Sequence, residues 1–484
     1  MNLWNTAYAP QTHRAAQHDK NQETIFSGPY QDLLGNYRKA LSRWLGIGYT
    51  PQMSASRTAA ASHLTAITHG ARLDDVTAVA ELPGGDLAKL TPRDRAFARH
   101  LVRTTLRRLG QIDAVLAKFL ERPLPPRRAQ ELALLRIGVA QLLFMGTPPH
   151  AAVNATVGAA GTKPLKKLLN AVLRRAATEG AAIATAEDAP RVNTPDWLWE
   201  QWELNYGSQT ARAIAAAHLD PPPLDLTARE DPSGWAERLG ATLLPTGSLR
   251  LSDAGRVADL SGYGAGAWWV QDAAAALPAQ LLLNALPRPA ADCRVADLCA
   301  APGGKTAQLA ASGANVFAVD RNVSRLARLK ENLDRLRLTA NLFADDAVTW
   351  TPPPNLDAIL LDAPCTATGT IRRHPDLPWR KCAESADALL PGQDRLLKAA
   401  AAHLGPGGIL VYTVCSLDPR EGEVPVVRLL DSRPDLHRMP ANAAEIGGLA
   451  DAVTASGDIR TLPSHLEYLG GMDGFYIARL RREP

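Results

Sequence analysis

Apolar residues recur with a helical period over the N-terminal third of the chain. The segment TPRDRAFARHLVRTTLRRLG, residues 91–110, shows this most clearly, because its apolar positions return every three or four residues. Thr91 can cap the predicted helix, and Pro92 fits its first position. Asp94 stands where the acid of a capping box would stand, and Gly110 can end the helix.

Two further segments predict helices in the same region. Residues 128–146 are apolar nearly all round, and residues 164–177 are amphipathic. We therefore expect an all-helical domain over residues 53–180. Residues 1–52 are polar without a clear period, which predicts a disordered extension, and the change of pattern raises the hypothesis that Met53 is the natural start. Alanine-rich, acidic residues 181–194 predict a linker.

The pattern changes to alternating strands and helices in the rest of the chain. Tryptophan-rich helices at 195–217 precede short segments up to residue 265 that predict a small α/β module of the RRM-like kind. Residues 266–484 repeat strand and helix, and their strands are apolar without alternation. This predicts an α/β domain with a mostly parallel, seven-stranded sheet covered on both faces. A last strand at residues 474–482 is expected to be an antiparallel edge.

Composition narrows the class of protein. The 484 residues are 46% hydrophobic and 21% charged, which is typical of globular domains, and a net charge of +4 confines any nucleic-acid contact to local patches. Five scattered cysteines argue against a disulfide framework, and no CxxC pair or His-rich tract suggests a metal. No apolar run approaches the roughly 18 residues of a membrane span, and the first residues lack a signal-peptide pattern. We expect a cytoplasmic, monomeric protein without membrane contact.

A glycine turn, CAAPGGKT at residues 299–306, follows the first strand of the α/β domain. It ends like a P-loop, but the first P-loop glycine would fall at Cys299, and Pro302 stiffens the loop. An NTPase stays an alternative, because an aspartate after a later apolar strand imitates a magnesium site. The other interpretation is a nucleoside ligand without a pyrophosphate. Gly303 and Gly304 let a ligand approach the backbone, and the helix start favours a carboxylate.

Aspartates follow three later strands of this domain. Asp320 ends the second strand, where an acid binds ribose hydroxyls in Rossmann-type units. Asp346 follows the third strand and can reach an adenine amino group, and Asp362 ends the fourth. A single such aspartate is often a turn cap, but three of them beside the glycine turn predict a ligand with a ribose, an adenine, a carboxylate and a positive charge. S-adenosylmethionine has all four.

Cys365 and Cys415 follow the fourth and fifth strands. If these strands are neighbours, both thiols face the ligand crevice at the carboxyl ends of the sheet. The alternative is a small buried hydrophobe, the interpretation that we apply to Cys293 and Cys382. A thiolate beside a sulfonium suits methylation of cytosine C5, because thiolate addition at C6 activates C5 for attack on the methyl group. Asp362 is placed to hydrogen-bond N3 of that cytosine.

Several long motifs carry a family resemblance. The segments DLCAAPGGKT, LLDAPCTATGTIRRHPDLPW, VYTVCSLDPREGE and GMDGFYIARL resemble the Sun/Nop family of RNA cytosine-5 methyltransferases, and WWVQDAAAALPAQLL resembles the segment before its cofactor strand. The resemblance covers about residues 195–482. Residues 55–180 resemble the RNA-binding fold of the antitermination factor NusB. This combination is similar to the bacterial branch that acts on 16S ribosomal RNA, and it implies a Rossmann-like methyltransferase domain that uses S-adenosylmethionine.

The resemblance also implies roles for residues. It implies Cys415 as the nucleophile and Cys365 as the residue that assists product release, although DNA cytosine methyltransferases use the Pro-Cys thiol, which leaves Cys365 as a rival nucleophile. Asp320 would hold the ribose, and Asp362 would serve both the cofactor and the base pocket. Adenine would meet Asp346, or Asp345, which replaces the usual glycine. The implied cofactor turn consists of Cys299, Ala300, Ala301, Pro302, Gly303, Gly304 and Lys305.

Basic residues indicate where RNA is held. One stripe lies four residues apart on the helix at 91–110, a second patch lies at 163–175, and the motif IRRHP lies beside the proposed pocket. Such residues attract phosphates without regard to sequence, although a solvated helix face has the same pattern. The target base must leave any stack, so loops or single strands of ribosomal RNA are expected. A non-catalytic RNA-binding protein is the second alternative. The predicted RNA contacts are Arg95, Arg99, Arg103, Arg107, Lys166, Lys167, Arg372, Arg373 and His374.

Overall fold

The computed structural model describes residues 54–354 and 356–484, and the chain divides into two compact units, Met1–Glu187 and Asp188–Pro484. The extension expected at residues 1–52 lies outside the described residues. The division falls within the predicted linker at 181–194, but residues up to Ala186 continue a long helix. Alanine is the best helix former, so an alanine-rich segment extends a helix as readily as it links two domains.

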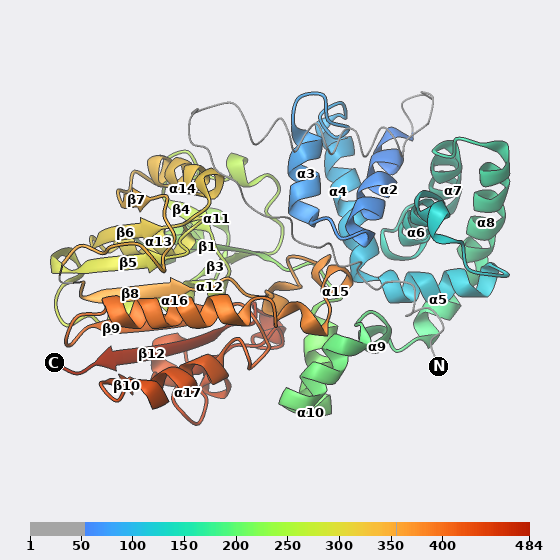
Figure 1. Cartoon of the computed structure of the whole chain (residues 1–484). Helices are drawn as coiled ribbons and strands as arrows, with labels where there is room; N and C mark the ends of the chain where they lie inside the picture. Colours follow the sequence, from blue (N-terminus) through green and yellow to red (C-terminus); the bar gives the residue numbers. More distant parts are fainter. Residues whose placement is uncertain (1–53, 355) are drawn as a thin grey trace, which may run out of the picture. The chain divides into compact units, whose positions relative to one another are not determined.

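The first unit is helical (Figure 1). Helix α6 lies at its centre, where it packs against α2, α4, α5, α7 and α8, as its nearly all-round apolar sequence predicts. None of the helices that the structure describes is both long and apolar enough to cross a bilayer. The helices of this unit are α2 (Ala55–Thr68), α3 (Leu73–Glu81), α4 (Pro92–Arg107), α5 (Leu109–Phe119), α6 (Ala129–Phe144), α7 (Pro149–Gly158) and α8 (Lys163–Ala186).

The start of α4 is capped as predicted, but its end differs. Thr91 Oγ1 accepts the Asp94 N–H at 3.2 Å and donates to Asp94 Oδ2 at 2.9 Å. Helix α4 ends at Arg107 and α5 begins at Leu109, so Gly110 lies inside a new helix and ends none. Tertiary packing overrides the glycine, because α5 buries an apolar face that continues past it.

The second unit begins with helices and a small antiparallel sheet in the order β2-β3-β1-β4. Its fourth strand, Trp268–Val270, lies beyond residue 265, so the small module extends further along the chain than we expect from the sequence. Strand β4 pairs with β1, which fixes this end of the module to the segment that leads into the large sheet. The elements are α9 (Ala189–Val192), α10 (Asp196–Ala217), β1 (Leu224–Ala228), α11 (Pro232–Leu239), β2 (Thr242–Leu243), β3 (Leu249–Leu251) and β4 (Trp268–Val270).

The large sheet has eight strands, with the order β10-β12-β9-β8-β5-β6-β7 and β11 paired to β12. The run from β9 to β7 is parallel, as predicted. Strand β12 is antiparallel to β9, but it is not an edge, because β10 and β11 pair with its other side. The strands are β5 (Arg294–Leu298), β6 (Asn315–Val319), β7 (Asn341–Phe343), β8 (Ala358–Asp362), β9 (Ile409–Val414), β10 (Leu436–Arg438), β11 (Ile459–Arg460) and β12 (Tyr476–Arg482).

Helices cover both faces of this sheet (Figure 1). Ala358 and Leu360 pack on the face of α12 (Ala273–Asn284), α13 (Gly304–Ala311) and α14 (Val323–Leu336), and Ile359 and Leu361 on the face of α16 (Leu390–His403) and α17 (Glu423–Ser432). Successive side chains of a strand point to opposite faces, so an unalternating apolar strand needs both layers. Because the helices cover only the two faces, polar groups can lie at the carboxyl ends of the parallel strands.

Candidate active site

Cys365 and Cys415 lie together at the carboxyl ends of β8 and β9. The two strands are parallel neighbours, with Asp362 opposite Thr413. Cys415 directly follows β9, and Cys365 lies three residues beyond β8. Their Sγ atoms are 3.4 Å apart, and both residues are half-buried. The structure therefore brings together the two thiols that the sequence places after neighbouring strands.

The two thiols are not equivalent. The pKa of Cys365 lies well above its ordinary value, first because its side chain hydrogen-bonds Cys415, and further because of burial and the nearby charge of Glu421. Cys365 therefore keeps its proton at neutral pH. A neutral thiol at this distance can donate a hydrogen bond to the sulfur of Cys415.

Lys305 places a positive charge beside the thiols. Its Nζ lies 2.8 Å from Asp362 Oδ2 and 5.3 Å from the centre of the Phe475 ring. Burial alone would lower the pKa of Lys305, but Asp362 first, and then Cys415 and Asp297, raise it above the ordinary value. The ammonium group stays charged, and a cation close to a thiol favours the thiolate.

The glycine turn after β5 has the backbone that a close ligand needs. Gly303 has a φ of +104°, and a Cβ on it would lie 2.7 Å from Leu329 Cγ, so both conformation and space require glycine. Helix α13 begins at Gly304, and the N–H groups of a first helical turn have no partner within their own helix. The turn thus offers donors at a positive helix end, which suits a carboxylate.

Asp320 connects the turn to the next strand. It is buried after β6, and its Oδ2 accepts the N–H of Ala301 at 3.1 Å, whereas its Oδ1 accepts the N–H of Asn322 at 2.9 Å. Cys299 lies at the start of the turn, and burial raises the pKa of its thiol to about 12. Cys299 is therefore a structural thiol of the turn and not a nucleophile.

Asp345 and Asp346 lie exposed after β7, the outer strand of the parallel run. Asp345 Oδ1 accepts the N–H of Asp346 at 2.8 Å, and Asp346 Oδ1 accepts the N–H of Val348 at 2.9 Å. Asp320 is close to this strand end, because its N–H donates to the Phe343 carbonyl at 3.1 Å. Both acids share the carboxyl edge with the turn, and which of them meets an adenine stays a prediction.

Asp297 is a site residue that the sequence analysis missed. It lies inside β5, its Oδ2 accepts the Thr306 hydroxyl at 2.5 Å, and its buried Oδ1 has no hydrogen-bond partner among the described residues. Burial raises its pKa to about 7. A P-loop offers this hydroxyl to Mg²⁺, whereas Thr306 uses it on Asp297, which disfavours the NTPase alternative. The sequence feature that could have revealed Asp297 is an acid between the apolar residues Ala296 and Leu298 of a buried strand.

Arg372 and Arg373 do not form the open phosphate grip that we expect from the sequence. Arg372 is 1% exposed, and its Nη2 donates to the Gly470 carbonyl at 2.5 Å. Arg373 binds Asp272 Oδ2 at 2.5 Å and Asp473 Oδ2 at 3.0 Å. These acids come from distant segments and neutralise the arginines in the interior. His374 next to them is half-buried.

The predicted stripe of helix α4 consists of Arg95, Arg99, Arg103 and Arg107. Arg99 pairs with Glu81 at 2.5 Å, and Arg103 Nη2 lies 3.9 Å from Asp74 Oδ1. Both acids belong to α3, and Arg107 is 8% exposed. Arg107 is therefore not available to RNA, Arg99 and Arg103 are partly neutralised by α3, and a role of this stripe in RNA binding stays a prediction.

Lys166 and Lys167 are exposed on α8, as predicted for the second patch. The same helix and the segment after α5 form a groove of about 280 Å³. Guanidinium groups, one acid and apolar side chains line it. The lining includes Phe119, Leu124, Leu168, Glu121, Arg122, Arg128 and Arg175. Basic groups beside apolar side chains suit a nucleic-acid strand with an unstacked base.

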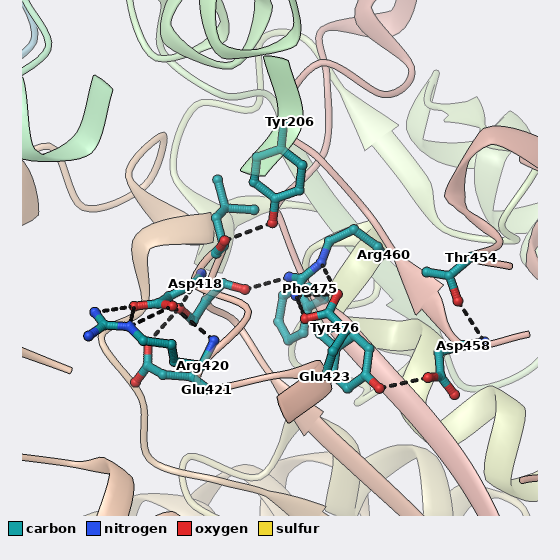
Figure 2. A network of polar contacts seen from close by, with 12 residues as sticks. Tyr206, Asp418, Arg420, Glu421, Glu423, Thr454, Asp458, Arg460, Phe475 and Tyr476 are labelled. Carbon is teal, nitrogen blue, oxygen red and sulfur yellow. Dashed lines mark hydrogen bonds and ion pairs between the residues drawn. The ribbon is translucent and has the colours of Figure 1, made fainter. Parts of the chain in front are cut away.

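The loop after Cys415 is held by buried polar contacts (Figure 2). Arg460 Nη1 donates to the Ser416 carbonyl at 2.6 Å, and its Nη2 pairs with Glu423 Oε2 at 2.9 Å. The Tyr206 hydroxyl donates to the Leu417 carbonyl at 2.7 Å. The loop that carries Cys415 is therefore fixed from α10, α17 and β11, contacts that no local pattern of the sequence indicates.

Comparisons with known proteins match both units. Residues 284–481 match the family model of the 16S rRNA methyltransferase RsmB/F, and residues 54–178 match the NusB family. The ribosomal RNA small subunit methyltransferase B of Xanthomonas campestris pv. campestris is 39% identical over 409 residues, 80% of this chain and 90% of the relative. The protein of the same name from Pseudomonas putida is 37% identical over 445 residues, 88% of this chain and 98% of the relative. The crystal structure of PH0851, 21% identical, has a TM-score of 0.66 and covers 90% of this chain, which supports the fold.

Proposed function

Because the chain belongs to the RsmB/F family of 16S rRNA methyltransferases, we propose that it methylates C5 of a cytosine in 16S ribosomal RNA through a covalent bond to Cys415. The resemblance to this family and the use of S-adenosylmethionine, both expected from the sequence, are confirmed. The observation that carries the finer proposal is the 3.4 Å separation of Cys365 and Cys415 Sγ beside the glycine turn.

The residues of the turn fit S-adenosylmethionine. The first-turn N–H groups of α13 suit its carboxylate, the Asp320 carboxylate suits its ribose hydroxyls, and Asp345 or Asp346 suits its adenine amino group. When bound, S-adenosylmethionine supplies an electrophilic methyl group.

Cys415 is the nucleophile of the proposed mechanism. Its thiolate adds to C6 of the cytosine, which forms a C–S bond and makes C5 electron-rich. The charged ammonium group of Lys305 lies beside it. We assign Asp362, which Lys305 holds at 2.8 Å, to the N3 edge of the cytosine, where charge develops in the adduct.

Cys365 is assigned to product release. After methylation, a base from the solvent takes the C5 proton, the C5–C6 double bond forms again, and the C6–S bond breaks with its electrons on the sulfur of Cys415. Cys365 keeps its own proton because its pKa is raised, so it can donate a hydrogen bond to the departing sulfur at 3.4 Å. We prefer Cys415 over Cys365 as the nucleophile because the family resemblance implies this order of roles.

The helical unit is proposed to hold the RNA. It carries exposed basic groups on α8 and at the groove beside it, where Lys166, Lys167 and Arg175 supply positive charge. The target cytosine must leave its stack to reach half-buried thiols, so a loop or single-stranded region of free small-subunit RNA suits the site. We propose that the protein acts as a monomer in the cytoplasm, before the subunit is fully assembled.

Methyl transfer to RNA tests this function directly. Purified protein, radiolabelled S-adenosylmethionine and 16S rRNA transcribed in vitro should give labelled RNA, and bisulfite sequencing should show one protected cytosine. Cys415→Ala should remove the product. Label on another base or another RNA would refute the proposal. Binding of RNA without transfer would support the non-catalytic alternative, and hydrolysis of ATP would support the NTPase.

A further inference from the structure

Glu421 is a fully buried acid in the loop between β9 and α17, and the proposed mechanism does not use it. Its main chain is fixed, because the Tyr412 hydroxyl donates to its carbonyl at 2.6 Å and its N–H donates to the Asp418 carbonyl at 3.0 Å. Its side chain points to the two loops that carry the thiols, because it binds Thr366 and Ser416. A buried carboxylate needs a reason, because leaving water is costly for it.

The carboxylate binds the residue next to each cysteine. Glu421 Oε1 accepts the N–H of Thr366 at 2.9 Å, and Oε2 accepts the Thr366 hydroxyl. Oε2 also accepts the Ser416 hydroxyl at 2.5 Å. Gln393 Nε2 completes the set with a bond of 2.9 Å to Oε1. Each oxygen thus accepts two hydrogen bonds, which is the arrangement that an ionised, acceptor-only carboxylate satisfies.

Further bonds join the same two loops to each other. The hydroxyls of Thr366 and Ser416 are 3.0 Å apart, and the Thr368 hydroxyl accepts the N–H of Leu417 at 2.9 Å. The N–H of Gly369 donates to the Cys415 carbonyl at 3.0 Å. The carboxylate therefore sits at the centre of a polar network that crosses from the loop of Cys365 to the loop of Cys415.

We propose that Glu421 is a positioning residue that holds Cys365 and Cys415 at reacting distance by binding Thr366 and Ser416 at once. The inference deepens the proposed function and rests on it for the catalytic consequence. The geometry itself, two loops bound to one carboxylate, is independent of the reaction. Displacement of a reacting group by about 1 Å can cost two orders of magnitude in rate, which is why such a support matters.

The charge of Glu421 has a second effect. Among the causes that raise the pKa of Cys365, after its hydrogen bond to Cys415 and its burial, is the negative charge of Glu421. The same carboxylate that positions Cys365 therefore helps to keep it protonated.

Cross-linking of the thiols tests the positioning without RNA or cofactor. Diamide oxidises two neighbouring thiols to a disulfide and is itself reduced, and mass spectrometry follows the peptide that links residues 365 and 415. The full-length Glu421→Ala variant should cross-link at least about tenfold more slowly than wild type. Glu421→Gln keeps one acceptor oxygen, and its amide N–H groups can donate hydrogen bonds to the two hydroxyls. Its cross-linking rate should therefore stay within about threefold of the wild-type rate. If Glu421 acted as a general base, Glu421→Gln would remove that function.

Asp458→Asn is the matched control. Asp458 is also buried, and it accepts the Tyr476 hydroxyl at 2.7 Å, but among the residues that the structure describes it forms no hydrogen bond or ion pair with Thr366 or Ser416. This variant should lose stability without slower cross-linking. If Glu421→Ala does not fold, Thr366→Val combined with Ser416→Ala removes the two hydroxyl arms and should slow cross-linking in the same way.

The outcomes separate the two proposals. Slower cross-linking in Glu421→Ala, with a lower kcat and an unchanged KM for RNA, supports the positioning role. Wild-type cross-linking in a folded Glu421→Ala variant, or in the double hydroxyl variant, overturns it. If the wild-type enzyme transfers no methyl group to cytosine but the cross-linking result holds, the proposed function fails and the positioning role stands.

Discussion

Lys305 Nζ lies 2.8 Å from Asp362 Oδ2, and this ion pair joins the glycine turn after β5 to the end of β8. In the proposed mechanism, the turn holds the cofactor and the end of β8 contacts the cytosine. One buried cation therefore neutralises Asp362 and also lies close to Cys415. A change at Lys305 should therefore affect both the glycine turn and the end of β8.

Lys305→Met should lower kcat by about two orders of magnitude, because it removes the buried positive charge close to Cys415 and leaves Asp362 without its partner. Lys305→Arg keeps the charge and should lose less. Steady-state kinetics with 16S rRNA and a titration of S-adenosylmethionine binding check this. An effect on cofactor affinity alone, with kcat unchanged, would contradict the role next to Cys415.

Replacement of each cysteine by alanine should block a different step of the reaction. With RNA that contains 5-fluorocytosine, wild-type protein should form a complex that survives denaturing gel electrophoresis, because the fluorine cannot leave as the C5 proton does. Cys415→Ala should form none. Cys365→Ala should form the complex with ordinary RNA as well, because product release is slowed when no thiol lies 3.4 Å from Cys415. The reverse pattern would assign the nucleophile to Cys365.

Asp297 should make stability depend on pH. Its pKa rises from an ordinary 3.8 to about 7 in the folded state, so the folded protein holds a proton that the unfolded chain has lost. Its contribution to the free energy of unfolding is therefore present below about pH 4 and is lost as the pH rises to about 7, by at most about 1.4 kcal/mol per pH unit. The free energy of unfolding, measured with urea across this pH range, should change less with pH for Asp297→Asn than for wild type. Equal slopes in both proteins would rule this out.

Arg373→Met should destabilise the protein by about 3–5 kcal/mol, because it removes the hydrogen-bonded cation of the buried Asp272 and leaves Asp473 with only Arg372, whose Nη1 lies 3.7 Å away. Urea unfolding measures this loss. A folded variant of normal stability that has lost only RNA affinity would instead indicate the open phosphate contact that we expect from the motif IRRHP.

Lys166 and Lys167 should act on RNA affinity and not on stability. If each contacts a phosphate, the double variant Lys166→Gln, Lys167→Gln should reduce the slope of log K against log salt by about 1.4 for single-stranded RNA. Lys330→Gln is the control, because Lys330 is exposed on α14 and pairs with Asp334 at 2.7 Å. Filter binding at several salt concentrations checks both. An unchanged slope would remove α8 from the RNA contacts.

The local pattern of apolar and polar residues was sufficient to predict the helices and strands. It also predicted which polar residues and cysteines lie at the carboxyl edge of the sheet. The apolar period predicts the helices of the first unit, and unalternating strands predict a parallel sheet with two helical layers. Parallel strands end at one edge, so Asp320, Asp362 and Cys415, which end or follow three of them, could be placed in one crevice from the sequence.

Only the tertiary structure decided which charged residues are free to act. Arg373 stands in a basic motif, but its partners Asp272 and Asp473 are 101 and 100 residues away along the chain. Glu421 lies 55 residues from Thr366, and the contact depends on how β8 and β9 pair. The period of a helix or strand follows from local backbone geometry, whereas neutralisation of a buried charge depends on segments that meet only when the chain folds.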